Sequence, residues 1–283
     1  MAHALTWLDV FTARPLTGNA LAVVHDADGV TDAAMLAFAR ETHLSETTFV
    51  QTATEPGADY RNRIWMMQGE LRFAGHPSLG TAVAVARARG ERAVTYVQET
   101  GAGLQPVDVE IGDAAAHASM LQEPATFGPE LDPAEVLGAL GLDVSAAHPE
   151  LPPQIVSTGI NQVVTPVREA AALDRVEPDP AALRSLLAGS SCVCAYLSYI
   201  DADHEAAQTR SFFVDGMSVV EDPATGSAAG PLMAYANART GVARLTIDQG
   251  VAMERASRIV CEAGERVRVA GDVVVVFEAT VAL

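Results

Sequence analysis

Lysine is absent from this chain of 283 residues, so all 18 basic residues are arginine. A pyridoxal phosphate enzyme needs a lysine for its Schiff base, and a Walker A loop needs one for the nucleotide phosphates. Both classes of protein are therefore excluded.

Cysteine is also scarce. Cys192, Cys194 and Cys261 are too few and too unevenly spaced for a disulfide framework or a zinc site. Alternation in SSCVCAYLSYI predicts that Cys192 and Cys194 are buried on one face of a strand. No histidines show the spacing H-x-x-x-H that is typical of paired metal ligands, so we expect no bound metal.

Basic residues are outnumbered by acidic ones, 18 to 36, so the formal net charge is −18. Nucleic acids and anionic membranes both require a basic surface, so neither is expected as a partner. The sequence shows no signal peptide and no apolar run of membrane-spanning length. These patterns favour a soluble, cytoplasmic protein with a small-molecule partner.

Glycine is used in two unusual places. Residues 221–230 read EDPATGSAAG, and residues 75–82 read GHPSLGTA; both precede a helical pattern and share P-x-x-G-[ST]-A. Asp222 and Pro223 are typical of an N-cap and first helical residue, but Gly226 should cost about 1 kcal/mol relative to alanine. We expect Gly80 and Gly226 to allow close approach of a ligand or of opposing backbone; packing of a helix against a strand is the alternative.

The order of the predicted elements also repeats. Thr17-Gly18-Asn19 and Thr158-Gly159-Ile160-Asn161 both precede strand patterns, and each half then reaches its glycine-rich helix. We therefore predict an α+β fold with two pseudo-symmetric lobes, each a twisted sheet around a central helix. The lobes are residues 1–122, joined by the C-terminal strand, and residues 123–283. An active-site cleft between them would receive both helix N-termini, which favour a small anion.

Paired helix N-termini of this kind resemble the diaminopimelate epimerase fold, in which each helix start carries a thiol. No cysteine lies near Gly75-His76 or Asp222, so a racemase that uses two thiols is not expected. Five motifs in the right order resemble the phenazine-biosynthesis PhzF-like family, which shares that fold. These motifs are DVFT with GNA (residues 9–12 and 18–20), SETTFV (45–50), FAGHPSLGTA (73–82), EDPATGSA (221–228), and Gln249-Gly250 before Arg255.

The resemblance implies a homodimeric isomerase that moves a proton on a small, cyclic, amino-substituted carboxylic acid without metal or organic cofactor. It implies that Glu46 is the general acid/base and that His76 and Asp222 hold and polarise the substrate. Substrate binding would fall to Asn19, to Ser227, and to the backbone at Gly75 and Gly226.

The residues themselves leave alternatives open. Glu46 precedes the strand-like TTFV. If its side chain points inward, desolvation would let the carboxyl group take and return a proton near neutral pH. Glu46 could also be an outward-facing strand residue or a helix cap. His76 could be a local hydrogen-bonding residue, and Asp222 only a helix cap. Ser227 lies outside a G-x-S-x-G elbow, so it is not expected to be a nucleophile. A non-catalytic protein that binds small anions, or an epimerase that uses one carboxylate and His76, would fit the same residues.

Overall fold

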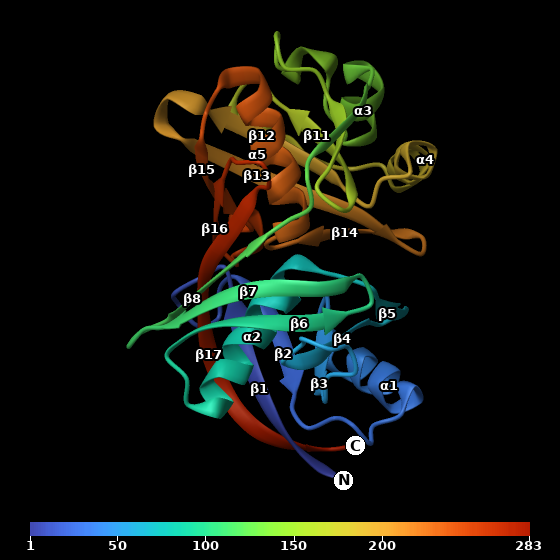
Figure 1. The fold of residues 1–283 in the computed structure, drawn as a ribbon. Coiled ribbons are helices and arrows are strands. Elements are labelled where there is room, and N and C mark those ends of the chain that lie inside the picture. The colour runs from blue at the N-terminus through green and yellow to red at the C-terminus, as the bar shows by residue number, and fades with distance from the viewer. The chain divides into compact units, whose positions relative to one another are not determined.

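The computed structural model describes residues 1–283, which form two compact units. The first unit comprises Met1–Leu121 and Ala270–Leu283, and the second comprises Gln122–Val269. The last strand, β17 (Arg268–Ala282), pairs antiparallel with the first strand, β1 (Ala2–Val10). The two chain ends therefore lie close together in the first unit (Figure 1).

The first unit is a mixed sheet that closes on itself. β1 pairs with β2, β2 runs parallel to β3, and β3 pairs antiparallel with β4. β4 pairs with β5 and runs parallel to β6; β6, β7 and β8 form a meander, and β8 pairs with β17. The bounds are β2 Asn19–Val24, β3 Thr47–Gln51, β4 Tyr60–Met66, β5 Gly69–Leu71, β6 Ala93–Thr100, β7 Gly103–Ile111 and β8 Ala116–Leu121.

Two helices complete this unit. α1 (Asp32–Thr42) packs on β3 and β4 over a core that includes Met35, Ala39 and Phe49. α2 (Gly75–Arg89) is buried from Gly75 to Ala86 and contacts β1–β4 and β6–β8, which surround it (Figure 1). A helix that is buried on every side must be apolar all round, which explains the run of small apolar residues in its sequence.

The second unit repeats this order of pairings. β10 pairs with β9 and with β11, β11 runs parallel to β12, and β12 pairs antiparallel with β13. β13 pairs with β14 and runs parallel to β15, which pairs with β16. The bounds are β9 Thr126–Glu130, β10 Gln154–Ser157, β11 Asn161–Pro166, β12 Ala195–Asp201, β13 Ala206–Asp215, β14 Ser218–Asp222, β15 Arg244–Gln249 and β16 Ser257–Glu262.

The helices of this unit are α3 (Pro133–Ala139), α4 (Pro180–Ser190) and α5 (Gly226–Thr240). α3 and α4 share a hydrophobic cluster with β12 and β13 that includes Leu137, Leu187, Leu197 and Phe212. α5 is the buried helix of the unit and contacts β10, β11, β15 and β16. Four short 3₁₀ helices span Val144–Ala146, Ala170–Arg175, Ala202–His204 and Val251–Met253. Mixed sheets with helices make the chain an α+β protein.

Two of the three Asp-Pro sequences cap helices as their pattern predicts. Asp132 accepts a hydrogen bond from the N–H of Ala134 at the start of α3, and Asp179 caps α4 in the same way. Asp222 does not cap α5, so that interpretation is wrong. It is the last residue of β14, and α5 begins only at Gly226 with Thr225 as its N-cap.

The shared P-x-x-G-[ST]-A pattern does not mark equivalent positions in the two units. Pro77 lies inside α2, whereas Pro223 lies before α5. Both helices have 15 residues, and both end at a glycine in the left-handed conformation, Gly90 and Gly241. Aligned by their ends, the helices pair Gly75 with Gly226, and not Gly80 with Gly226 as the pattern suggested.

Gly80 is a packing residue. A Cβ at this position would lie 2.6 Å from Leu21 Cδ2 and 2.8 Å from Val10 Cγ2. Neither distance is tolerable for carbon atoms, so the absence of a side chain lets α2 approach β1 and β2. The expectation that a ligand approaches at Gly80 is therefore wrong, and the alternative of helix–strand packing holds.

All three cysteines are free and buried, which confirms the predicted burial of Cys192 and Cys194. Cys192 and Cys194 lie in the irregular segment before β12 and not in a strand, which corrects that part of the prediction. No helix has both the length and the apolar character that crossing a membrane requires.

Candidate functional site

The first unit brings together three of the predicted residues, Asn19, Glu46 and His76, which we call the first cluster. Asn19 is the first residue of β2, Glu46 immediately precedes β3, and His76 is the second residue of α2. Nδ2 of Asn19 lies 3.3 Å from Nδ1 of His76, and Oε2 of Glu46 lies 3.5 Å from Nε2 of the same ring. Gly75, the first residue of α2, is buried and directly precedes His76 in the sequence.

His76 is neutral at pH 7, because burial lowers the pKa of its ring to about 3. The 3.5 Å contact with Glu46 is within ion-pair range, but the lowered pKa means that it joins a carboxyl group to an uncharged imidazole. The Asn19 amide can only donate through Nδ2, so Nδ1 of His76 accepts and Nε2 carries the proton. The N–H of the ring is therefore on the side of Glu46.

Local structure explains the position of Glu46. α1 ends at Thr42, and His43 reverses the chain in the left-handed conformation, with φ 52°. The hydroxyl groups of Thr42 and Thr47 are 2.9 Å apart across this turn, and Thr48 is hydrogen-bonded to Thr81 of α2 at 2.8 Å. The Glu46 side chain is only 14% exposed, so it is neither an outward strand residue nor a cap of α1.

The second unit contains a second cluster, formed by Asp222, Thr225 and Gln249. The hydroxyl of Thr225 donates to Asp222 Oδ2 at 2.6 Å. Nε2 of Gln249 donates to the carbonyl of Asp222 at 2.8 Å and to Thr225 Oγ1 at 3.0 Å, and its Oε1 accepts from the N–H of Thr225 at 3.2 Å. All three side chains are buried, so the turn between β14 and α5 is fixed by polar contacts.

Gly226 and Ser227 begin α5, where the first N–H groups of a helix have no partner within the helix and the dipole favours an anion. The carbonyl of Gly226 accepts from Nε2 of Gln122 at 2.9 Å. Thr158 in turn donates to Oε1 of Gln122, which fixes the amide. Ser227 is half-buried and Gly226 fully buried.

Sequence reasoning missed the parts played by Thr225, Gln249 and Gln122. Gln249-Gly250 was recognised only as a motif. Gly250 has φ 72°, and a Cβ there would lie 2.6 Å from the carbonyl oxygen of Pro223, so this motif approaches the Asp222–Thr225 turn closely. Nothing in the spacing of Gln249 or Gln122 could have revealed their partners, which are 24 or more residues away.

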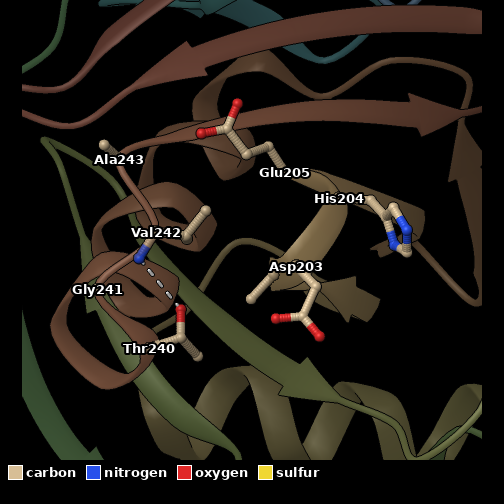
Figure 2. A pocket seen from close by; sticks show the side chains of 8 residues that line it. Asp203, His204, Glu205, Thr240, Gly241, Val242 and Ala243 are labelled. Carbon is tan, nitrogen blue, oxygen red and sulfur yellow. Dashed lines mark hydrogen bonds between the residues drawn. The ribbon is translucent and has the colours of Figure 1, made fainter.

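An open pocket of about 580 Å³ lies elsewhere in the second unit, between the 3₁₀ helix Ala202–His204 and the C-terminal end of α5 (Figure 2). Asp203, Glu205 and Thr240 are among its lining residues, and the N–H of Val242 donates to Thr240 Oγ1 at 3.4 Å. A 15-residue helix is about 20 Å long, so this pocket is remote from the second cluster. It contains none of the predicted site residues.

Comparison with known proteins gives one consistent answer. The family model described as phenazine biosynthesis-like protein (PhzC-PhzF) matches residues 8–279. The chain is 37% identical to an uncharacterised isomerase of Mesorhizobium japonicum, covering 89% of this chain and 87% of that protein. It is 36% identical to the trans-2,3-dihydro-3-hydroxyanthranilate isomerase of Pseudomonas aeruginosa, covering 94% and 93%.

Among solved structures, a predicted epimerase from Pseudomonas aeruginosa matches with a TM-score of 0.86 at 33% identity, covering 99% of both chains. The α+β fold and these relatives define an isomerase. The chain belongs to the phenazine biosynthesis-like protein family.

Proposed function

We propose that this isomerase moves a proton on a small, cyclic, amino-substituted carboxylic acid, by general acid/base catalysis and without an organic cofactor. The observation that carries the proposal is the first cluster: a carboxyl group, Glu46, lies 3.5 Å from a neutral, buried imidazole. Such a pair combines a group that can accept a proton with a hydrogen-bond donor that does not ionise at neutral pH.

Glu46 is the general acid/base in this proposal. A positively charged histidine at 3.5 Å would stabilise the ionised carboxylate and make it a weaker base. Neutral His76 stabilises the ionised form of Glu46 far less, so the carboxylate stays a better base. The N–H at Nε2 can also donate a hydrogen bond to a substrate oxygen on which negative charge develops. Asn19, which the family resemblance gives as a substrate-binding residue, also holds the His76 ring in this tautomer.

We propose that Asp222, Ser227 and the backbone N–H groups at Gly75 and Gly226 hold the substrate. Two helix N-termini offer hydrogen-bond donors and partial positive charge to a carboxylate. The matching order of strand pairings in the two units, and their buried helices of equal length, support a pseudo-symmetric, diaminopimelate epimerase-like fold.

The test is proton NMR in D₂O with trans-2,3-dihydro-3-hydroxyanthranilate and a panel of cyclic amino-substituted acids. The named activity of the Pseudomonas aeruginosa relative makes this acid the first choice. We expect wild type to introduce deuterium at a substrate carbon, and Glu46→Gln to reduce the rate at least about 1,000-fold while the protein stays folded and still binds the acid. Glu41→Gln changes an exposed glutamate of α1 and should match wild type. Full activity of Glu46→Gln would refute the proposal.

An epimerase is the second candidate, because a carboxyl and an imidazole in contact could also exchange protons at a chiral carbon. The similarity to a predicted epimerase favours it. Chiral chromatography together with the NMR spectra separates the two outcomes: racemisation of an amino acid with deuterium at Cα indicates an epimerase, and a new double-bond position in the NMR spectra indicates the proton-shift isomerase. We also propose a homodimer, which analytical ultracentrifugation tests.

A further inference from the structure

Thr225 is the N-cap residue of α5, yet its hydroxyl does not cap the helix. The usual behaviour is seen in α1, where the hydroxyl of Thr31 accepts from the N–H of Ala34. Thr225 instead donates to Asp222 Oδ2 at 2.6 Å, a short distance typical of a hydrogen bond to a charged acceptor. The Thr225 hydroxyl therefore contacts a candidate substrate-binding carboxylate, and α5 lacks the stabilisation of a side-chain cap.

The direction of this hydrogen bond follows from the orientation of the Gln249 amide. The backbone N–H of Thr225 can only donate, so the amide atom that faces it must be the oxygen. The hydroxyl of Tyr196 also points to this oxygen at 2.9 Å, while Tyr196 itself accepts from Thr209. Tyr196 is fully buried and burial raises its pKa well above 10, so its hydroxyl stays protonated and acts as a donor here.

With Oε1 fixed in this way, Nε2 of Gln249 faces Thr225 Oγ1 and the carbonyl of Asp222. An amide nitrogen has no lone pair to offer, so Thr225 Oγ1 accepts from it. The single hydroxyl proton of Thr225 must then point to Asp222 Oδ2. A chain of donors therefore runs from Gln249 through Thr225 to Asp222, and it ends on Oδ2 of Asp222 as the acceptor.

From this geometry we propose that Thr225 and Gln249 are positioning residues that hold Asp222 in one rotamer as a hydrogen-bond acceptor during the reaction. The proposal rests on the function proposed above for Asp222. Asp222 then enters the reaction as a carboxyl group of fixed orientation that accepts a hydrogen bond from the substrate, for instance from an amino group. The binding partner implied for Asp222 is thus an N–H or O–H group of the substrate.

The test compares Thr225→Val with Thr225→Ser. Valine keeps the shape of threonine and loses only the hydroxyl, and no helix cap is lost because Thr225 provides none. We expect kcat of Thr225→Val to fall about 10- to 100-fold, as for loss of a hydrogen bond to a charged group, while KM changes less than about 3-fold. Thr225→Ser restores the donor and should recover kcat to within about 3-fold of wild type.

The control is Thr165→Val, which removes another buried threonine hydroxyl of the second unit, bonded only to the carbonyl of Val163 at 3.4 Å. It should leave kcat unchanged. In a double-mutant cycle, Gln249→Met should lower kcat less in the Thr225→Val background than in wild type, because both act through one contact. A folded Thr225→Val enzyme with wild-type kcat, or a Thr225→Ser enzyme as slow as Thr225→Val, overturns the proposal.

A crystal structure separates this proposal from the proposed function. If wild type exchanges no proton on any acid, the proposed function fails, but the donor chain can still be examined. We expect the Asp222 carboxylate to occupy more than one rotamer in Thr225→Val and a single rotamer in Thr225→Ser. A single, unmoved rotamer in Thr225→Val shows that the hydroxyl does not position Asp222 and overturns the inference on its own.

Discussion

A neutral His76 makes a quantitative prediction about stability and pH. Its pKa is about 3 in the folded protein, against about 6.5 for a histidine in an unfolded chain. Between these values the unfolded state binds a proton that the folded state does not, so lowering the pH favours unfolding. The stabilising contribution is complete above pH 6.5 and is lost as the pH falls towards 3.

The expected magnitude follows from the two pKa values. At pH 5 the unfolded histidine is about 97% protonated and folded His76 about 1%, which corresponds to a loss of about 2 kcal/mol relative to pH 7. His76→Gln has no group that titrates in this range. We therefore expect the free energy of unfolding of His76→Gln to fall about 2 kcal/mol less than that of wild type between pH 7 and pH 5.

Urea denaturation at the two pH values measures the free energy of unfolding of each protein. The quantity compared is the loss of this free energy between pH 7 and pH 5, because glutamine can change stability equally at every pH. His204→Gln is the control of opposite sign. A hydrogen bond to Asp201 raises the pKa of His204, so His204 stabilises the fold below pH 6.5 and loses that effect as the pH rises through its folded pKa. His204→Gln should therefore lose more stability on acidification than wild type. An equal loss of stability between pH 7 and pH 5 in wild type and His76→Gln would show that His76 ionises in the folded protein. It would remove the basis for the proposed acid/base pair.

Two further predictions test the surroundings of this residue. Asn19→Leu removes the donor to Nδ1 of His76, so ¹⁵N NMR should show a mixture of Nδ1–H and Nε2–H forms where wild type shows only Nε2–H. Turnover should fall about 10-fold. A single unchanged tautomer would contradict the assignment. Gly80→Ala should destabilise the first unit by about 1–3 kcal/mol in urea denaturation, because its Cβ would lie 2.6 Å from Leu21 Cδ2. Gly189→Ala in α4, where nothing lies within 4 Å of the added carbon, should instead stabilise by up to about 1 kcal/mol, and the same sign for both variants would contradict the packing argument.

The features predicted correctly from sequence are those set by neighbouring residues. The stretch TDAAMLAFARET (residues 31–42) has apolar residues at helical spacing, which predicts a helix, and α1 spans Asp32–Thr42 with Thr31 as its side-chain cap. The caps at Asp132 and Asp179 are equally local. The α+β class followed from the alternation of strand and helix patterns, which also depends only on short stretches of sequence.

The errors have the opposite cause. Asp222-Pro223 has the same local pattern as the two true caps, but Asp222 pairs with Ser211 in the sheet and continues β14. Gly80 looked like a ligand-approach residue because its neighbours, Leu21 and Val10, are about 60 or more residues away in the chain. The family resemblance implied separate roles for Glu46 and His76, but no spacing in this sequence could have revealed the 3.5 Å distance between their side chains.

Alignment of the two buried helices by their ends suggests how the units have come to differ. Gln98 and Gln249 each lie eight residues after the glycine that ends the helix, on β6 and β15. Gln249 holds the turn before α5, whereas Gln98 accepts from Asn62 at 2.9 Å and its Nε2 has no partner. The residue that matches Thr225 is Ala74, which has no hydroxyl, so the first unit has no donor chain of this kind. The same alignment matches His76 with Ser227. The first unit therefore carries the candidate acid/base residues Glu46 and His76 beside a turn without a donor chain, whereas in the second unit polar contacts fix the turn that carries Asp222.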